Sequence, residues 1–130
     1  MKHLSRWIFI KPVISIIFVG LVAGCAVQPQ LFHGQLSLLD KGLTEGQVQN
    51  RVTIPPATRT RVEADRRAFM FQMYRLNNGV QTDPYVLCFE DGKLTYWGYI
   101  SEFRRHPDRV LNEALNGALP DLSINNRGSR

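Results

Sequence analysis

Hydrophobic residues along this 130-residue chain change their spacing from one segment to the next, and each spacing predicts a different element. Residues 12–24 form a continuous apolar run. Two later segments, at about 31–41 and 45–52, carry apolar side chains at partial helical spacing and are predicted to be short helices. Thr44 and Gln47 have the spacing of a capping box, which favours a helix start immediately before the second segment.

Strict alternation of side chains predicts strands further along the chain. The segment 66–76, RRAFMFQMYRL, fits a strand with Phe69, Phe71 and Met73 on one face and Met70, Gln72 and Tyr74 on the other. A helix is the alternative interpretation of this segment. Residues 57–65 are polar and alternating, so they fit either an edge strand or an extended loop.

The strongest pattern is a hairpin built from residues 84–90 and 93–103. Asp91-Gly92 between them suits a two-residue turn with positive φ at both positions. This turn predicts a register that pairs Glu90 with Lys93 and then continues without interruption. In that register the core face carries Tyr85, Leu87, Phe89, Leu94 and Tyr96, and the opposite face carries Val86, Cys88, Glu90, Lys93, Thr95, Trp97 and Tyr99.

A short helix is expected at about 108–116, because Pro107 lies near its start and Gly117 follows its end. The elements together predict an α+β fold in which two short N-terminal helices pack on a three-stranded antiparallel meander, with a short C-terminal helix added. We expect this domain to span residues 32–117 and the tail, residues 118–130, to be disordered.

The N-terminal residues resemble the signal of a bacterial lipoprotein. A basic start precedes the apolar run, and Leu21-Val22-Ala23-Gly24-Cys25 resembles a lipobox. The resemblance implies a signal peptide over 1–24, a lipidated Cys25 and a tether over 25–31. Ala26, rather than Asp, after the cysteine implies the periplasmic face of the outer membrane. An uncleaved transmembrane anchor is the alternative, although the run is shorter than the roughly 20 residues that a span needs.

Charge and cysteine content narrow the functional classes. The chain has 16 Lys and Arg against 11 Asp and Glu, but Lys2, Arg6 and Lys11 leave with the signal, so 13 basic residues remain. This small excess gives little support for nucleic-acid binding. If Cys25 carries lipid, Cys88 is a lone thiol, either a small hydrophobe buried in a strand or a reactive group.

The sequence offers no recognisable catalytic, cofactor-binding or metal-binding pattern, so we expect neither an enzyme nor a small-molecule substrate. His33 and His106 lie in terminal or connecting segments, and no spacing of His, Cys and Asp suggests a metal site. Arginines cluster around the predicted strands. They fit a solvated rim, or contact with anionic headgroups or an acidic partner; these residues are Arg59, Arg61, Arg66, Arg67, Arg104 and Arg105.

The stretch Gly42-Leu43-Thr44-x-x-Gln47-Val48 resembles the Gly-Met-Thr-x-x-Gln-Val signature of small lipoproteins of the BamE (SmpA/OmlA) type, and Phe89–Leu94 looks like their closing hairpin. The resemblance implies two helices on three strands, a fold shared with β-lactamase inhibitor proteins. It also implies a role in outer-membrane protein assembly, with inhibition or regulation of an envelope enzyme as the alternative. Val52-Thr53-Ile54-Pro55 departs from the Leu-Gly-x-Pro turn usual in that family.

A protein partner is expected on the face of the hairpin opposite the core. Val86, Trp97 and Tyr99 share that face in the predicted register, and Met70 and Tyr74 would extend it. Such side chains on an exposed sheet face often mark an interface. The alternative is that the C-terminal helix folds back over this face. The sequence therefore predicts a lipid-anchored envelope protein that acts as an accessory or scaffold through protein contact.

Overall fold

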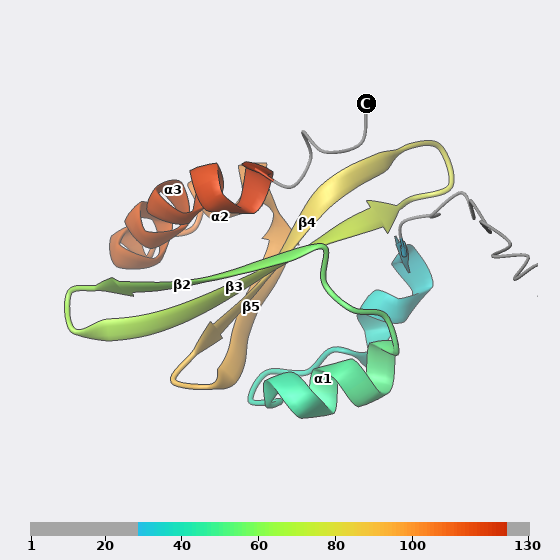
Figure 1. Cartoon of the computed structure of the whole chain (residues 1–130), viewed down its shortest axis with the longest axis horizontal. Coiled ribbons are helices and arrows are strands. Elements are labelled where there is room, and N and C mark those ends of the chain that lie inside the picture. Colours follow the sequence, from blue (N-terminus) through green and yellow to red (C-terminus); the bar gives the residue numbers. More distant parts are fainter. Residues whose placement is uncertain (1–28, 125–130) are drawn as a thin grey trace, which may run out of the picture.

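The computed structural model describes residues 29–124 and shows a curled mixed sheet with helices on both faces (Figure 1). Its strands are β1 (Leu31–Phe32), β2 (Thr58–Ala64), β3 (Arg67–Asn77), β4 (Thr82–Glu90) and β5 (Lys93–Tyr99). Its helices are the 3-10 helix η1 (His33–Leu38) and the α-helices α1 (Glu45–Val52), α2 (Ile100–Arg104) and α3 (Arg109–Ile124). No helix in this part of the chain is long and apolar enough to cross a membrane.

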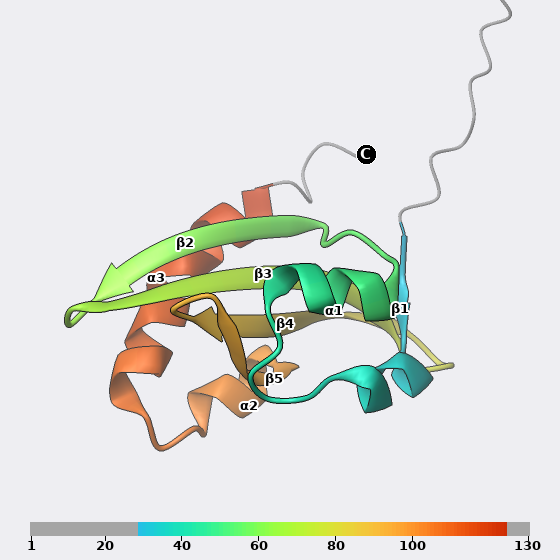
Figure 2. The same cartoon turned by 90° about the horizontal axis from the view of Figure 1, so that it is seen from below.

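Strand β3 is the centre of the sheet. One of its edges pairs with β4, which pairs with β5, and all these pairings are antiparallel. The other edge is shared by two strands: β2 runs antiparallel along most of it, and β1 pairs in parallel with Leu76 and Asn77 at its end. Figure 2 shows the long β2–β3 hairpin extending past α1 at one end of the sheet, with β1 at the other end.

Alternation along the strands divides the interior into two cores, one on each face of the sheet. Side chains facing α1 and η1 form one cluster, namely Leu31, Leu39, Leu43, Val48, Val52, Tyr74, Leu76, Tyr85, Leu87, Phe89 and Leu94. Side chains facing α2 and α3 form the other, namely Phe69, Phe71, Met73, Val86, Cys88, Phe103, Leu111, Ala114, Leu115, Ala118 and Leu122. The face assignment predicted for residues 66–76 is confirmed.

The predicted fold, two N-terminal helices on a three-stranded meander, is wrong. The first expected helix, at about 31–41, is instead the short strand β1 followed by the 3-10 helix η1. Leu31 pairs with the end of β3 and is buried, while the side chain of Gln35 donates to the carbonyl of Val52. These contacts with distant residues outweigh a weak helical pattern that contains Gly34. Residues 57–65 also add a strand, β2, which is an edge strand over most of the expected segment.

The second expected helix is confirmed as α1. The hydroxyl of Thr44 accepts from the backbone N–H of Gln47, and the side chain of Gln47 accepts from the N–H of Thr44. Val48 and Val52 are fully buried one helical turn apart. The Gly42-Leu43-Thr44 stretch before the helix also contacts the sheet, because the N–H of Leu94 donates to the carbonyl of Leu43.

The hairpin turn is confirmed, but its register beyond the turn is not. Asp91 and Gly92 have φ of 50° and 80°, and Glu90 pairs with Lys93 as predicted. A β-bulge then inserts Thr95, so that Cys88 pairs with Tyr96, not Thr95. One extra residue moves every later side chain of β5 to the opposite face of the sheet.

The helix expected at about 108–116 continues to Ile124 as α3, so the disordered tail predicted from residue 118 is wrong for residues 118–124. Ala118 and Leu122 are buried against the sheet, and the hydroxyl of Thr58 donates to the carbonyl of Leu122. This burial outweighs the helix-weakening effects of Gly117 and Pro120. Residues 125–130 lie outside the described part of the chain.

Candidate functional site

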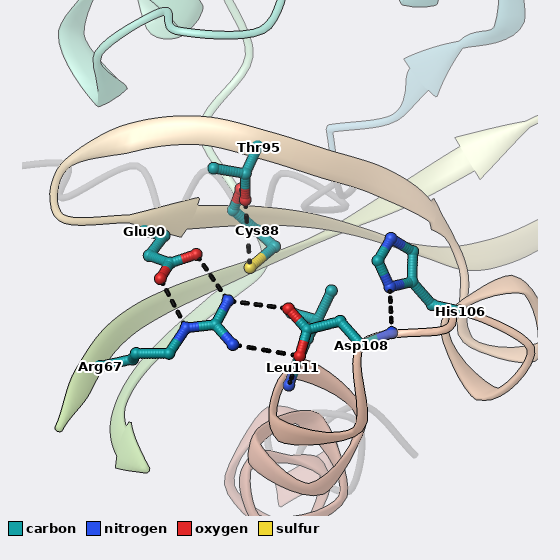
Figure 3. Close-up of polar contacts among 7 residues, drawn as sticks. All are labelled: Arg67, Cys88, Glu90, Thr95, His106, Asp108 and Leu111. Atoms are coloured by element: carbon teal, nitrogen blue, oxygen red, sulfur yellow. Dashed lines mark hydrogen bonds and ion pairs between the residues drawn. The ribbon is translucent and has the colours of Figure 1, made fainter. Parts of the chain in front are cut away.

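Three charged side chains meet where the sheet contacts the start of α3, as Figure 3 shows. Arg67, the first residue of β3, donates from Nε and Nη2 to the two carboxylate oxygens of Glu90, at 2.6 and 2.9 Å. It also donates from Nη1 and Nη2 to the two carboxylate oxygens of Asp108, at 3.0 and 2.8 Å. One guanidinium therefore holds two carboxylates in bidentate geometry, and joins β3, β4 and α3.

The electrostatics of this cluster favour the charged form of every member. Hydrogen bonds from Arg67 lower the pKa of Asp108 to about 2, and they also lower the pKa of Glu90. The same two carboxylates raise the pKa of Arg67. The carboxylate of Asp108 additionally accepts from the backbone N–H of Leu111, so it caps the first turn of α3.

Cys88 lies beside this cluster but is protected from reaction. Its side chain is fully buried, and burial raises the pKa of its thiol to about 12. The hydroxyl of Thr95, the bulge residue, lies 3.9 Å from its Sγ. A nucleophilic cysteine needs a thiolate near neutral pH, and this environment opposes it. The buried small-hydrophobe interpretation of Cys88 is therefore confirmed.

His106 completes the surroundings of the cluster in a structural role. Its Nδ1 accepts from the backbone N–H of Asp108 at 3.1 Å, and its ring lies edge-on to Tyr96 at 4.4 Å between centroids. Among residues 29–124, no three His, Cys, Asp or Glu side chains are grouped to hold a metal ion. We therefore interpret the Arg67 cluster as a clamp that fixes α3 on the sheet.

A hollow of about 160 Å³ lies on the α1 face of the sheet, next to the turn between β4 and β5. It is lined by the first residue of α1 and by residues of β2, β3, β4 and the β4–β5 turn, namely Glu45, Arg61, Ala68, Phe69, Met70, Phe89, Asp91 and Gly92. Met70 is half-buried there and Arg61 is exposed. Within the described residues, the guanidinium of Arg61 makes no ion pair or hydrogen bond, so it is available to an incoming group.

One wall of this hollow is fixed by a polar network. The carboxylate of Glu45 accepts from Arg59 at 2.6 Å and from the side chain of Gln72 at 2.7 Å. Gln72 in turn accepts from the hydroxyl of Tyr74, and burial raises the pKa of Tyr74 to about 12. The network ties the first residue of α1 to β2 and β3. The neighbouring Arg61 remains unpaired beside it.

The five residues predicted to bind a partner do not form one surface. Val86 is fully buried on the α3 face, where Leu111 and Leu115 belong to the same core. The alternative prediction, that the C-terminal helix folds back over this face, is correct for Val86. The other four lie on the α1 face: alternation along β3 places Met70 and Tyr74 there, and the bulge turns Trp97 and Tyr99 to the same face. Tyr74 is buried, whereas Met70, Trp97 and Tyr99 are half-buried.

Sequence reasoning also missed the Arg67 cluster. The predicted register placed Glu90 beside Lys93 on the face opposite the core, but Glu90 bonds to a residue 23 positions away, and Asp108 lies 41 positions from Arg67. No local pattern links residues at such separations. The one available signal was the alternation along β3, which places Arg67 on the same face of the sheet as Phe69 and Phe71.

Comparison with known proteins identifies no relative of this chain: no protein family matches it, and neither a curated protein nor a solved structure resembles it significantly. The predicted signal peptide, residues 1–24, and the predicted lipidation site Cys25 lie outside the described residues, as do positions 26–28 of the predicted tether.

Proposed function

We propose that this chain is a lipid-anchored accessory or scaffold protein on the periplasmic face of the outer membrane, and that it acts by contacting another envelope protein. The observation that carries the proposal is the lipobox-like Leu21–Cys25, followed within six residues by the first strand of a folded domain. The finer prediction, a part in outer-membrane protein assembly, has no support in the observed fold.

The hollow beside Arg61 and Met70 is the surface that best suits a protein partner. Met and Arg are enriched at protein interfaces. Such an interface usually has an apolar centre surrounded by a polar or charged rim. Both side chains line the hollow, where Arg61 is exposed and Met70 is half-buried. A partner that inserted an apolar side chain there could pair a carboxylate with the free guanidinium.

Two experiments test the proposal separately. Cys25→Ser should release the protein from the outer membrane or leave it unprocessed, because stable anchoring depends on the acyl chains. If this variant still fractionates wholly with the outer membrane, the lipid anchor is wrong. The contact is tested by a photo-crosslinking amino acid at Met70 in living cells, with the same amino acid at the exposed Glu113 on α3 as control.

We expect a discrete crosslinked product from position 70 and none from position 113. Arg61→Glu should abolish this product, whereas Arg104→Glu should preserve it, because Arg104 is also an exposed arginine but lies on α2, away from the lining of the hollow. Equal products from positions 70 and 113, or no effect of Arg61→Glu, would show that the hollow is not the contact surface.

A further inference from the structure

Two of the large hydrophobic side chains that remain exposed, Phe32 and Val80, lie at one end of the domain. Within residues 29–124 the exposed large hydrophobic side chains are Phe32, Leu38 and Val80, with exposed fractions of 57%, 41% and 93%. Phe32 pairs with Asn77 at the end of β3, and Val80 lies in the turn that follows. In both Figure 1 and Figure 2, β1 and the β3–β4 turn lie at the same end of the sheet. The third residue, Leu38, ends η1, which follows β1 directly.

The two segments that form this end are also poor in acidic and basic side chains, and Asp83 and Arg75 border them. No Lys, Arg, Asp or Glu occurs in residues 26–39 or in residues 76–82. The backbone of the β3–β4 turn is bonded internally: the side chain of Asn78 accepts from the N–H groups of Val80 and Gln81. An uncharged turn whose donors are satisfied can enter an apolar environment at low cost.

The chain itself limits how far this end can be from the lipid. The side chain of Asn77 donates to Gln30 at 3.0 Å, so the N-terminal chain is held at the end of β3 from residue 30 onward. Only residues 26–29 lie between that point and Cys25. Five residue steps span at most about 17 Å when fully extended. That is about half of the roughly 36 Å length of the 11-residue strand β3.

We propose that Phe32 and Val80 enter the headgroup region of the bilayer beside the acylated Cys25, so that the domain stands on its β1 end. This inference rests on the proposed lipid anchor. It places the hollow at Arg61 and Met70 at the opposite end of β3, facing away from the membrane and open to a partner. Because the short tether keeps this end close to the bilayer, we expect it to contact the lipid surface rather than a protein.

The experiment measures the depth of a nitroxide on the full lipidated protein in phosphatidylethanolamine and phosphatidylglycerol vesicles. Val80→Cys provides one labelling site, since Cys88 is buried and Cys25 carries the lipid. Glu63→Cys, exposed on β2 near the far hairpin turn, is the matched control. The measured quantity is the accessibility of the nitroxide to oxygen relative to a water-soluble nickel complex, and Phe32→Cys repeats it independently.

We expect positions 80 and 32 to be accessible to oxygen and shielded from nickel, and position 63 to show the reverse. Equal oxygen-to-nickel ratios at 80 and 63 would overturn the proposed orientation. Shielding of position 80 from both reagents, in detergent as well as in vesicles, would indicate a protein contact and would overturn it equally. Mass spectrometry of each sample distinguishes the two proposals: an unlipidated Cys25 refutes the anchor, whereas a lipidated protein with an aqueous position 80 refutes only the orientation.

Discussion

Asp108→Asn isolates the contribution of the Arg67 clamp to stability. Asparagine caps helices about as well as aspartate, so the bond to the N–H of Leu111 should survive the change. What is lost is the negative charge opposite the guanidinium of Arg67. Because the clamp joins α3 to the sheet, its loss should lower the free energy of unfolding of the whole domain.

The size of the effect follows from the pKa of Asp108, which is about 2 in the folded protein against an ordinary value of 3.8. At about 1.4 kcal/mol for each pH unit, this difference corresponds to roughly 2 kcal/mol. The side chain of Asp108 is 29% exposed, so solvent screening makes this an upper value. Since the folded pKa lies below the unfolded one, the stabilisation is complete above about pH 4 and disappears as the pH falls through 2.

Urea unfolding of the chain without residues 1–25, followed by circular dichroism at pH 7, 5, 3 and 2, measures this difference. We expect Asp108→Asn to lose up to about 2 kcal/mol at pH 7 and to approach the parent at pH 2, where Asp108 of the folded parent is about half protonated. Glu113→Gln is the control, because its pair with Arg109 is exposed and should contribute less than about 0.5 kcal/mol. An equal loss for Asp108→Asn at pH 7 and pH 2 would show that the charge is not the cause.

Three further changes test other parts of the structure. Gly92→Val should lower the free energy of unfolding by more than about 1 kcal/mol in thermal melts, because φ is +80° there, whereas Gly46→Ala in α1 should raise it slightly. Leu122→Ala should cost about 2–5 kcal/mol in urea unfolding if α3 packs beyond Gly117, while Asp121→Ala, at an exposed position, should cost little. Cys88, with its raised pKa, should resist iodoacetamide at pH 8 until urea unfolds the domain; rapid alkylation of the native protein would contradict its burial.

Elements governed by neighbouring residues could be predicted from the sequence. The capping box of Thr44 and Gln47 fixed the start of α1, and Asp91-Gly92 fixed the turn of the hairpin. Alternation over residues 66–76 gave the two faces of β3. In each case the determining contacts lie within a few positions, so the pattern carries the structural information.

Elements governed by distant contacts could not be predicted. Nothing local marks Thr95 as a bulge, yet it reversed the faces of Trp97 and Tyr99 and so divided the predicted contact surface. Gly117 looked like a helix end because the buried surface that Ala118 and Leu122 meet is formed by strands earlier in the chain. The hollow was missed for the same reason, since four separate elements supply its walls.

The bulge at Thr95 also determines which changes of length the chain tolerates. Deleting this one residue would remove the bulge and leave Cys88 opposite Tyr96, so Tyr96 and Trp97 would keep their faces. One further residue inserted before Tyr96, with the bulge retained, would instead set Tyr96 opposite Leu87, and it would turn Tyr96 towards α1 and Trp97 towards α2. Both cores would then receive an aromatic ring of the wrong size. Thr95 is therefore the position between Phe89 and α2 where the loss of one residue preserves the alternation of side chains, whereas elsewhere in this segment spacing carries more structural information than residue identity.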